Sequence, residues 1–206
     1  VTGNTRRFGA SLEKIKQVVN VRDGEIMFGL NMVVHKGKTI FVGDTSVHEY
    51  PTSEQMVEMA ISAARVVRLF GFEPKVAFVS HSTFGQPLTS RTKHIRNAVD
   101  LLKEKKVDFE FDGDMQPDVA LNPEYEELYP FSKIVGKANI LIMPGQHSAA
   151  ISYKMMKTLG DTKVIGPLLI GLGLPIEIAP LRSSTSEIIN LASIAAYSAD
   201  IINYNK

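Results

Sequence analysis

The chain has 206 residues, of which 44% are hydrophobic and 22% are charged, values typical of a globular protein. Its 23 Lys and Arg nearly balance its 22 Asp and Glu, so the composition does not indicate the basic surface of a nucleic-acid-binding protein. The chain contains no cysteine, which excludes disulfides, thiolate catalysis and Cys-ligated zinc. Its length fits one large domain or two small lobes that share a core.

The longest apolar stretch, residues 166–181, is interrupted by Gly, Pro and Glu and is too short to cross a bilayer. No membrane partner is therefore expected. The start, "VTGNTRRF", contains neither Met nor the apolar segment of a signal peptide. We therefore expect a cytoplasmic protein that has been cut from a longer chain.

The first third of the chain is expected to form two helices and a hairpin. The elements are a helix after Ser11, strands at 26–34 and 39–42, and a helix from Thr52 to Gly71. Gly37 supplies the turn between the two strands. Thr52 and Gln55 have the spacing of a capping box, which indicates where the second helix begins.

The rest of the chain alternates short apolar strands with helices. The expected strands are 76–79, 107–111, 139–143, 163–166 and 175–178. The expected helices are about 89–104, a short one within 122–129, one ending at Gly160 and one beginning at Ser184. This alternation predicts an α/β fold with a mostly parallel sheet flanked by helices. Ligands bind such sheets at the carboxyl ends of the strands, which directs attention to the loops after Val79, Phe111, Met143 and Gly166.

The segment "SHSTFG" (80–85) follows one of these strands. Hydroxyl groups and backbone N–H groups at such a turn can hold a phosphate or an acyl carbonyl. The alternative interpretation is a strand-to-helix turn whose Ser and Thr side chains bond their own backbone. Neither of the common glycine-rich phosphate-binding motifs occurs in the chain.

The segment "DGDMQPD" places Asp112, Asp114 and Asp118 around one glycine. Two neighbouring carboxylates perform acid–base chemistry if burial separates their pKa values. The alternative is a turn followed by a helix N-terminus, where acidic side chains are stabilised by the helix dipole. The five histidines are scattered without a helical pair, so we expect no dedicated metal site.

Four hydroxyl residues, 183–186, stand directly before the last predicted helix. Ser184 and Glu187 have capping-box spacing, which accounts for one hydroxyl. Arg182 beside a helix N-terminus makes the segment a candidate phosphate seat. A nucleophilic serine needs a base within hydrogen-bond reach, and the sequence does not show one.

Five motifs taken together resemble the phosphate acetyl/butyryl transferase family. They are "VAFVSHSTFG", "DGDMQPDVALN", "MPGQHSAAISYK", "VIGPLLIGLGLPIEI" and "SEIINLASIAA", in the family's order and spacing over essentially the whole chain. "VTGNTRRF", "FVGDTSVHEYPTSEQMVEMA" and "YPFSKIVGKANILIMPG" are most similar to the phosphotransacetylase-like C-terminal region of bacterial NADP-dependent hybrid malic enzymes.

The resemblance implies a two-lobe fold similar to isocitrate and isopropylmalate dehydrogenases. Residues 21–172 would form the main lobe, while 1–20 and 173–206 would be remnants of a second lobe whose N-terminal part is missing. The family dimerises through the lobe that is present, which implies a homodimer within a larger homo-oligomer of the parent protein. No cofactor is expected in this fragment, and NADP and a divalent metal belong to the missing malic enzyme region.

The chain departs from active phosphotransacetylases at polar positions of the site. In an ungapped register, Pro180 and Leu181 replace the Ser and Arg of the family's Ser-Arg-Gly motif, while Glu187 matches the acid that helps to deprotonate CoA. A register shifted by one residue recovers the Arg as Arg182 but leaves Leu181 in place of the Ser. The other replaced positions carry Phe84, Gln86, Ala149 and Ala150. Losing one such transition-state donor typically costs about 10²–10³ in rate, so the sequence favours a domain without acetyl transfer.

The leading hypothesis is a regulatory domain that binds acetyl-CoA as an allosteric inhibitor of the oxidative decarboxylation of malate to pyruvate. Its candidate acetyl-CoA or phosphate contacts are Ser82, Thr83, His147, Tyr153, Lys154, Arg182, Ser183 and Ser184. Glu187 is a catalytic candidate only if the domain is active. The alternatives are a working phosphate acetyl/butyryltransferase that uses acetyl phosphate and CoA, and an oligomerisation scaffold without a ligand.

Overall fold

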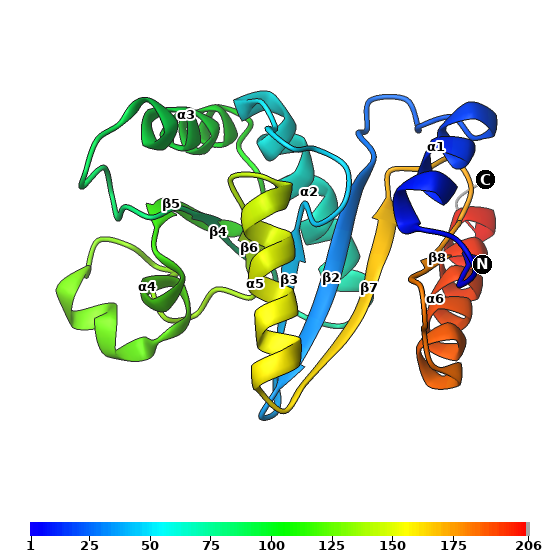
Figure 1. Ribbon diagram of the computed structural model, residues 1–206. Coiled ribbons are helices and arrows are strands. Elements are labelled where there is room, and N and C mark those ends of the chain that lie inside the picture. The colour runs from blue at the N-terminus through cyan, green and yellow to red at the C-terminus, as the bar shows by residue number, and fades with distance from the viewer. Residues whose placement is uncertain (205–206) are drawn as a thin grey trace.

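The computed structural model describes the backbone of residues 1–204 and the side chains of residues 1–199. Its centre is a six-stranded sheet in the order β5-β4-β6-β3-β2-β7 (Figure 1). The strands are β2 (Phe28–His35), β3 (Lys38–Gly43), β4 (Lys75–Val79), β5 (Glu110–Met115), β6 (Ile140–Ile142) and β7 (Thr162–Ile170). β2 runs antiparallel to both of its neighbours, and the other pairs are parallel. Since β2 is the single reversed strand, the mostly parallel sheet is confirmed.

Helices cover both faces of this sheet, with α5 in front and α2 behind in the view of Figure 1. The helices are α1 (Phe8–Val18), α2 (Ser53–Leu69), α3 (Ser90–Glu104), α4 (Pro117–Leu121), α5 (Gln146–Leu159) and α6 (Thr185–Tyr204), with a 3₁₀ helix η1 (Pro123–Leu128). This arrangement confirms the α/β class. The expected likeness to isocitrate and isopropylmalate dehydrogenases stays a prediction.

The central strands are apolar on both faces because both faces are covered. Successive side chains of a strand point to opposite faces of the sheet. Phe41 of β3 accordingly joins the cluster that contains Met56 of α2, whereas the next residue, Val42, joins the cluster that contains Ala149 of α5. Two hydrophobic cores therefore sandwich the sheet and fix the positions of α2 and α5.

A smaller layer lies beyond the edge strand β7. It contains α1, α6 and two short strands, β1 (Thr2–Gly3) and β8 (Ile178–Ala179), which pair in parallel (Figure 1). Leu191 of α6 packs with Leu168 of β7 and Ala179 of β8. The described parts of segments 1–20 and 173–206 thus gather on one side of the main sheet, and their assignment to a second lobe stays a prediction.

Two expected loops are parts of strands, and these predictions were wrong. β5 continues to Met115 and β7 to Ile170, so Asp112, Asp114 and Gly166 lie inside strands. Gly113 suggests a turn in the sequence, but a Cβ at that position would lie 2.7 Å from the carbonyl oxygen of Phe78 on β4. The glycine is needed because two strand backbones approach closely here, and not because the chain turns.

Helix boundaries were predicted more accurately than strand boundaries. The capping box of Thr52 and Gln55 is present, and α2 begins directly after Thr52. α1, in contrast, begins at Phe8, so that Ser11 lies buried within the helix instead of preceding it. The strand expected at 175–178 is reduced to β8, which pairs with only two residues of β1.

Candidate functional site

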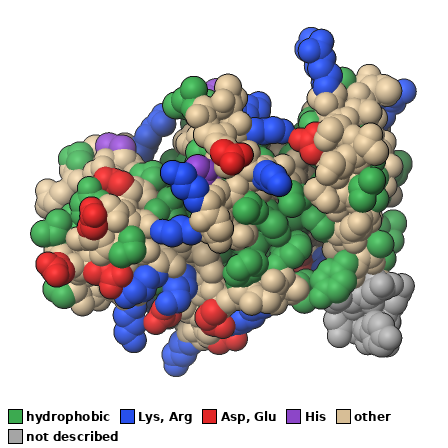
Figure 2. All heavy atoms as spheres, turned by 90° about the horizontal axis from the view of Figure 1, so that it is seen from below, with side chains coloured by type: hydrophobic (Ala, Val, Ile, Leu, Met, Phe, Trp, Pro, Cys, Tyr) green, Lys and Arg blue, Asp and Glu red, His purple; other side chains and the backbone are tan. Residues whose placement is uncertain are grey.

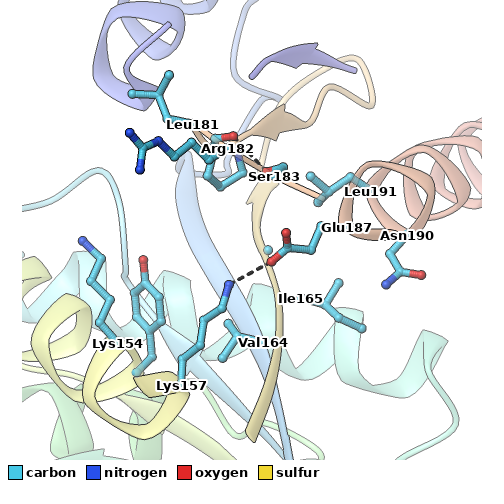
Figure 3. Close-up of a pocket in the computed structure, with 13 residues that line it drawn as sticks. Lys154, Lys157, Val164, Ile165, Leu181, Arg182, Ser183, Glu187, Asn190 and Leu191 are labelled. Carbon is cyan, nitrogen blue, oxygen red and sulfur yellow. Dashed lines mark hydrogen bonds and ion pairs between the residues drawn. The ribbon is translucent and has the colours of Figure 1, made fainter. Parts of the chain in front are cut away.

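A hollow of about 190 Å³ lies between α5, β7 and the start of α6. Tyr153 and Lys157 line it from α5, Gly166 from β7, and Ser183 and Glu187 from the other side (Figure 3). The hollow therefore lies where the main sheet and the layer beyond β7 meet. Four of the residues predicted for ligand binding, Tyr153, Lys154, Arg182 and Ser183, line this hollow.

Three cationic side chains surround this hollow. Lys154 and Lys157 come from α5, and Arg182 comes from the loop that precedes α6 (Figure 3). Lys154 and Lys157 are three residues apart and therefore share one side of the helix. Arg182 has a φ of 63° in the left-handed region. The convergence of these side chains gives the hollow a positive charge suited to phosphate or carboxylate groups.

Glu187 is the acidic side chain in the hollow, and three hydrogen bonds hold its carboxylate. Lys157 Nζ donates to its Oε1 at 2.8 Å, while Ser184 N and Ser184 Oγ donate to its Oε2 at 2.8 and 3.0 Å. The hydrogen bond from Lys157, followed by that from Ser184, lowers the pKa of the Glu187 carboxyl to about 2. The carboxylate therefore keeps its charge at any physiological pH.

The start of α6 explains two of the four hydroxyl residues. Ser184 Oγ accepts from Glu187 N at 3.3 Å, and the carboxylate of Glu187 accepts from Ser184 N, which confirms the predicted capping box. Ser183 Oγ donates to the carbonyl of Pro180 at 2.8 Å and so holds the preceding turn. Both serines have local structural roles, although Ser183 also lines the hollow.

The loop after β4 has its own internal hydrogen bonds. Ser82 is buried and donates to the buried carboxylate of Asp114. Asp114 also accepts from Gly85 N at 3.0 Å and forms an ion pair with Arg96 at 3.6 Å. The Ser82 hydroxyl is therefore bonded to a side chain of β5 and not to its own backbone, and a ligand-binding role for this loop stays a prediction.

Thr83 lies beside a different, aromatic hollow. Its Oγ1 accepts from Gln116 N at 3.2 Å. The aromatic rings of this second hollow are Phe84, Tyr125, Tyr129 and Phe131, and the Phe84 and Phe131 ring centroids lie 4.8 Å apart. Phe84 therefore packs in an aromatic cluster.

Two further predicted groups do not join the cationic hollow. His147 is exposed at the start of α5, with Nε2 3.3 Å from Glu49 Oε1. Asp112 accepts from Gly113 N, and Asp118 accepts from the Tyr125 hydroxyl. With Asp114 already paired, the three aspartates do not form an acid–base pair.

Lys157 was missed by the sequence reasoning, although a signal for it exists. It follows Lys154 by three residues, so both ammonium groups leave the same side of α5. Tyr153, which precedes Lys154, also lines the hollow and is half-buried. Burial raises the pKa of its phenol, so the hydroxyl stays neutral and is able to donate a hydrogen bond.

One face of the molecule carries side chains of both charges. Seen from below, Lys and Arg side chains are interspersed with Asp and Glu, next to a group of exposed hydrophobic side chains (Figure 2). The described residues contain no group of three or more His, Asp or Glu placed to hold a metal ion. Between residues 1 and 204, none of the helices has the length and apolar character required to cross a membrane.

Both the sequence and the fold of this chain are similar to those of known proteins. The sequence pattern of the phosphate acetyl/butaryl transferase family matches residues 1–196. The chain belongs to this family. A phosphotransacetylase structure from Streptococcus pyogenes has 27% sequence identity and a TM-score of 0.88, covering 96% of this chain and 61% of that one. The family's fold is thus present over nearly the whole chain.

Curated proteins of two kinds are similar to this chain. An NADP-dependent malic enzyme from Rhizobium meliloti is 44% identical over 199 residues, which are 97% of this chain but only 26% of the malic enzyme. A phosphate acetyltransferase from Bacillus subtilis is 29% identical over 201 residues, which are 62% of its length. The chain therefore spans about a quarter of the malic enzyme relative and less than two thirds of the acetyltransferase.

Proposed function

We propose that this chain is a phosphotransacetylase-like regulatory domain of a malic enzyme, which binds acetyl-CoA and has no acetyl transfer activity of its own. The similarity to malic enzymes over 97% of the chain supports the parent enzyme. The cationic hollow supports a ligand that carries phosphate groups. The hydrogen bond from Lys157 to Glu187 is the main observation in support of a domain without turnover.

The size and charge of the hollow suit one end of such a ligand. A volume of about 190 Å³ accommodates a small anionic group, not a whole nucleotide, so most of the ligand would lie outside it. Lys154 rises from α5 and Arg182 lies above it, in the loop that precedes α6 (Figure 3). Charge-assisted hydrogen bonds from these side chains to phosphate are stronger than neutral ones.

The state of Glu187 argues against acetyl transfer. The pKa of an ordinary cysteine thiol is about 8.5, whereas the pKa of Glu187 is lowered to about 2. General base catalysis works best when the pKa of the base lies near the working pH. A carboxylate that is already bonded to Lys157 and Ser184 therefore accepts a thiol proton poorly, and we expect turnover to be lost while binding remains.

Binding without turnover allows regulation if the ligand favours one state of the parent enzyme. A ligand shifts an equilibrium only by its difference in affinity for the two states. We propose that acetyl-CoA stabilises a state in which malate decarboxylation is inhibited. NADP and a divalent metal would act in the malic enzyme region, outside this chain.

The first experiment is a calorimetric titration of the chain with acetyl-CoA, with CoA and acetyl phosphate as comparison ligands. A charge-assisted hydrogen bond contributes about 1.5–3 kcal/mol. The Lys154→Ala, Arg182→Ala double variant should therefore bind acetyl-CoA about tenfold more weakly, or worse. Arg91→Ala is the matched control, because Arg91 lies at α3 over the ring of Tyr50. Equal affinity of the double variant and the control for acetyl-CoA would contradict the proposal.

A second measurement addresses the alternatives. Acetyl phosphate and CoA are incubated with the chain, and the formation of acetyl-CoA is followed. Turnover that disappears in Glu187→Gln would establish a working acyltransferase. The absence of both turnover and acetyl-CoA binding, in this chain and in the intact parent, would favour a scaffold.

A further inference from the structure

The carboxylate of Glu187 occupies the position of a bound anion. Its three donors are an ammonium group from Lys157, a backbone N–H at a helix N-terminus, and the hydroxyl of Ser184. A phosphate group is bound in proteins by the same kinds of donor. The structure therefore contains an anion seat that is filled by a side chain of the protein itself.

The seat retains positive charge even when Glu187 fills it. Within residues 1–199, neither Lys154 nor Arg182 forms an ion pair, while Lys157 is paired with Glu187. Three cations thus surround one carboxylate in the lining of the hollow. An arriving dianion is attracted by the uncompensated charge and is repelled by Glu187.

We propose that Glu187 is a built-in competitor, which a phosphate-bearing ligand must displace from Lys157. This inference rests on the proposed function, because it requires that the hollow binds such a ligand. The side chains of Lys157 and Glu187 are 49% and 35% exposed, and ion pairs with this exposure are weak. A dianion held by Lys154, Lys157 and Arg182 together therefore displaces a single carboxylate.

Displacement has a structural consequence because the ion pair joins two layers of the molecule. Lys157 belongs to α5 on the main sheet, whereas Glu187 belongs to the first turn of α6 beyond β7 (Figure 3). When the ligand binds Lys157, this connection between α5 and α6 is lost, while Ser184 N and Ser184 Oγ still donate to Oε2 of Glu187. Ligand binding at the hollow therefore makes the first turn of α6 more mobile.

The test is a titration with inorganic phosphate of the wild type, Glu187→Gln and Lys157→Gln. Glutamine is accepted at the third position of a capping box, so Glu187→Gln retains the helix start while removing the competing charge. We expect Glu187→Gln to bind phosphate a few-fold more tightly, up to about fivefold for an exposed pair. Lys157→Gln should bind phosphate more weakly than the wild type.

Glu126→Gln is the matched control. Glu126 forms an ion pair with Lys137 at 2.6 Å, and these side chains are 38% and 46% exposed, close to the values of Glu187 and Lys157. The control should bind phosphate as the wild type does. Phosphate affinity that is unchanged or weaker in Glu187→Gln would overturn the proposal.

Parallel titrations with acetyl-CoA separate this inference from the proposed function. If Glu187→Gln tightens phosphate binding but no variant binds acetyl-CoA, the result supports competition by Glu187 and contradicts acetyl-CoA as the ligand. If acetyl-CoA binds equally to the wild type and Glu187→Gln, and phosphate affinity is also unchanged, the result contradicts competition by Glu187 and supports acetyl-CoA binding. Hydrogen exchange adds a direct readout: saturating phosphate should speed exchange in the first turn of α6, and slower exchange there would contradict the displacement.

Discussion

Glu177 is a carboxyl group with little access to water. It is 4% exposed, and its Oε2 accepts from Leu169 N at 3.1 Å. Burial raises its pKa from 4.5 to about 8, although the hydrogen bond from Leu169 and the charge of the N-terminus oppose this shift. The folded protein therefore holds a proton on Glu177 at a pH where the unfolded chain has released it.

This difference makes stability depend on pH. Between about pH 4.5 and 8 the folded state binds more protons at Glu177 than the unfolded state, so the free energy of unfolding should fall as the pH rises through this window. Glu177→Gln should remove that decline, because an amide does not titrate. Thermal unfolding of both proteins at pH 5 and pH 8.5 measures this difference in stability. The variant should gain stability relative to the wild type at the higher pH. Parallel pH profiles of the two proteins would show that Glu177 is not the cause.

At the level of single elements, the helix starts are the features most directly encoded in the sequence. Thr52 accepts from Gln55 N, and Gln55 Oε1 accepts from Thr52 N at 2.8 Å. Thr89 and Thr92 repeat this arrangement at α3, although threonine at the third position was not anticipated. The capping groups are local in sequence, which is why these helix starts could be predicted.

Thr52→Ala tests the contribution of one cap. Removing an N-cap hydroxyl typically costs about 1 kcal/mol, and we expect a loss of that size in the free energy of unfolding by urea. Thr158→Ala is the comparison, because Thr158 is exposed on α5 and alanine is the better helix former. The same loss of stability in both variants would assign the effect to something other than the cap.

At the level of the whole molecule, the packing of α6 against the sheet positions one wall of the cationic hollow. Leu191 is 2% exposed and packs with Leu168 and Ala179, whereas Ile189 on the same helix is 58% exposed. Leu191→Ala should lower the free energy of unfolding by about 2–5 kcal/mol, because it leaves a cavity at this junction. Hydrogen exchange in α6 should also become faster.

Ile189→Ala provides the control for this junction. Its side chain is largely in solvent already, so truncation should change the free energy of unfolding by about 0.5 kcal/mol or less. Chemical denaturation of both variants makes the comparison. Equal losses would mean that Leu191 is not what holds α6 to the sheet.

The sequence by itself determined the α/β class, the family and most helix boundaries. These rest on local signals, since periodicity, capping residues and collinear motifs are all read along the chain. Strand ends were less predictable, because Gly113 and Gly166 resemble turn residues until the neighbouring strands are in place. Whether a strand continues depends on what pairs beside it.

Only the tertiary structure decided how the candidate site is assembled. It brought Lys157 of α5 to Glu187 of α6, thirty residues apart in sequence, and separated Ser82, Thr83 and His147 from the cationic hollow. The residues of a site are selected by distance in space, which no local pattern encodes. The sequence thus supplied the charged residues, and packing determined that Lys157 and Glu187 form an ion pair.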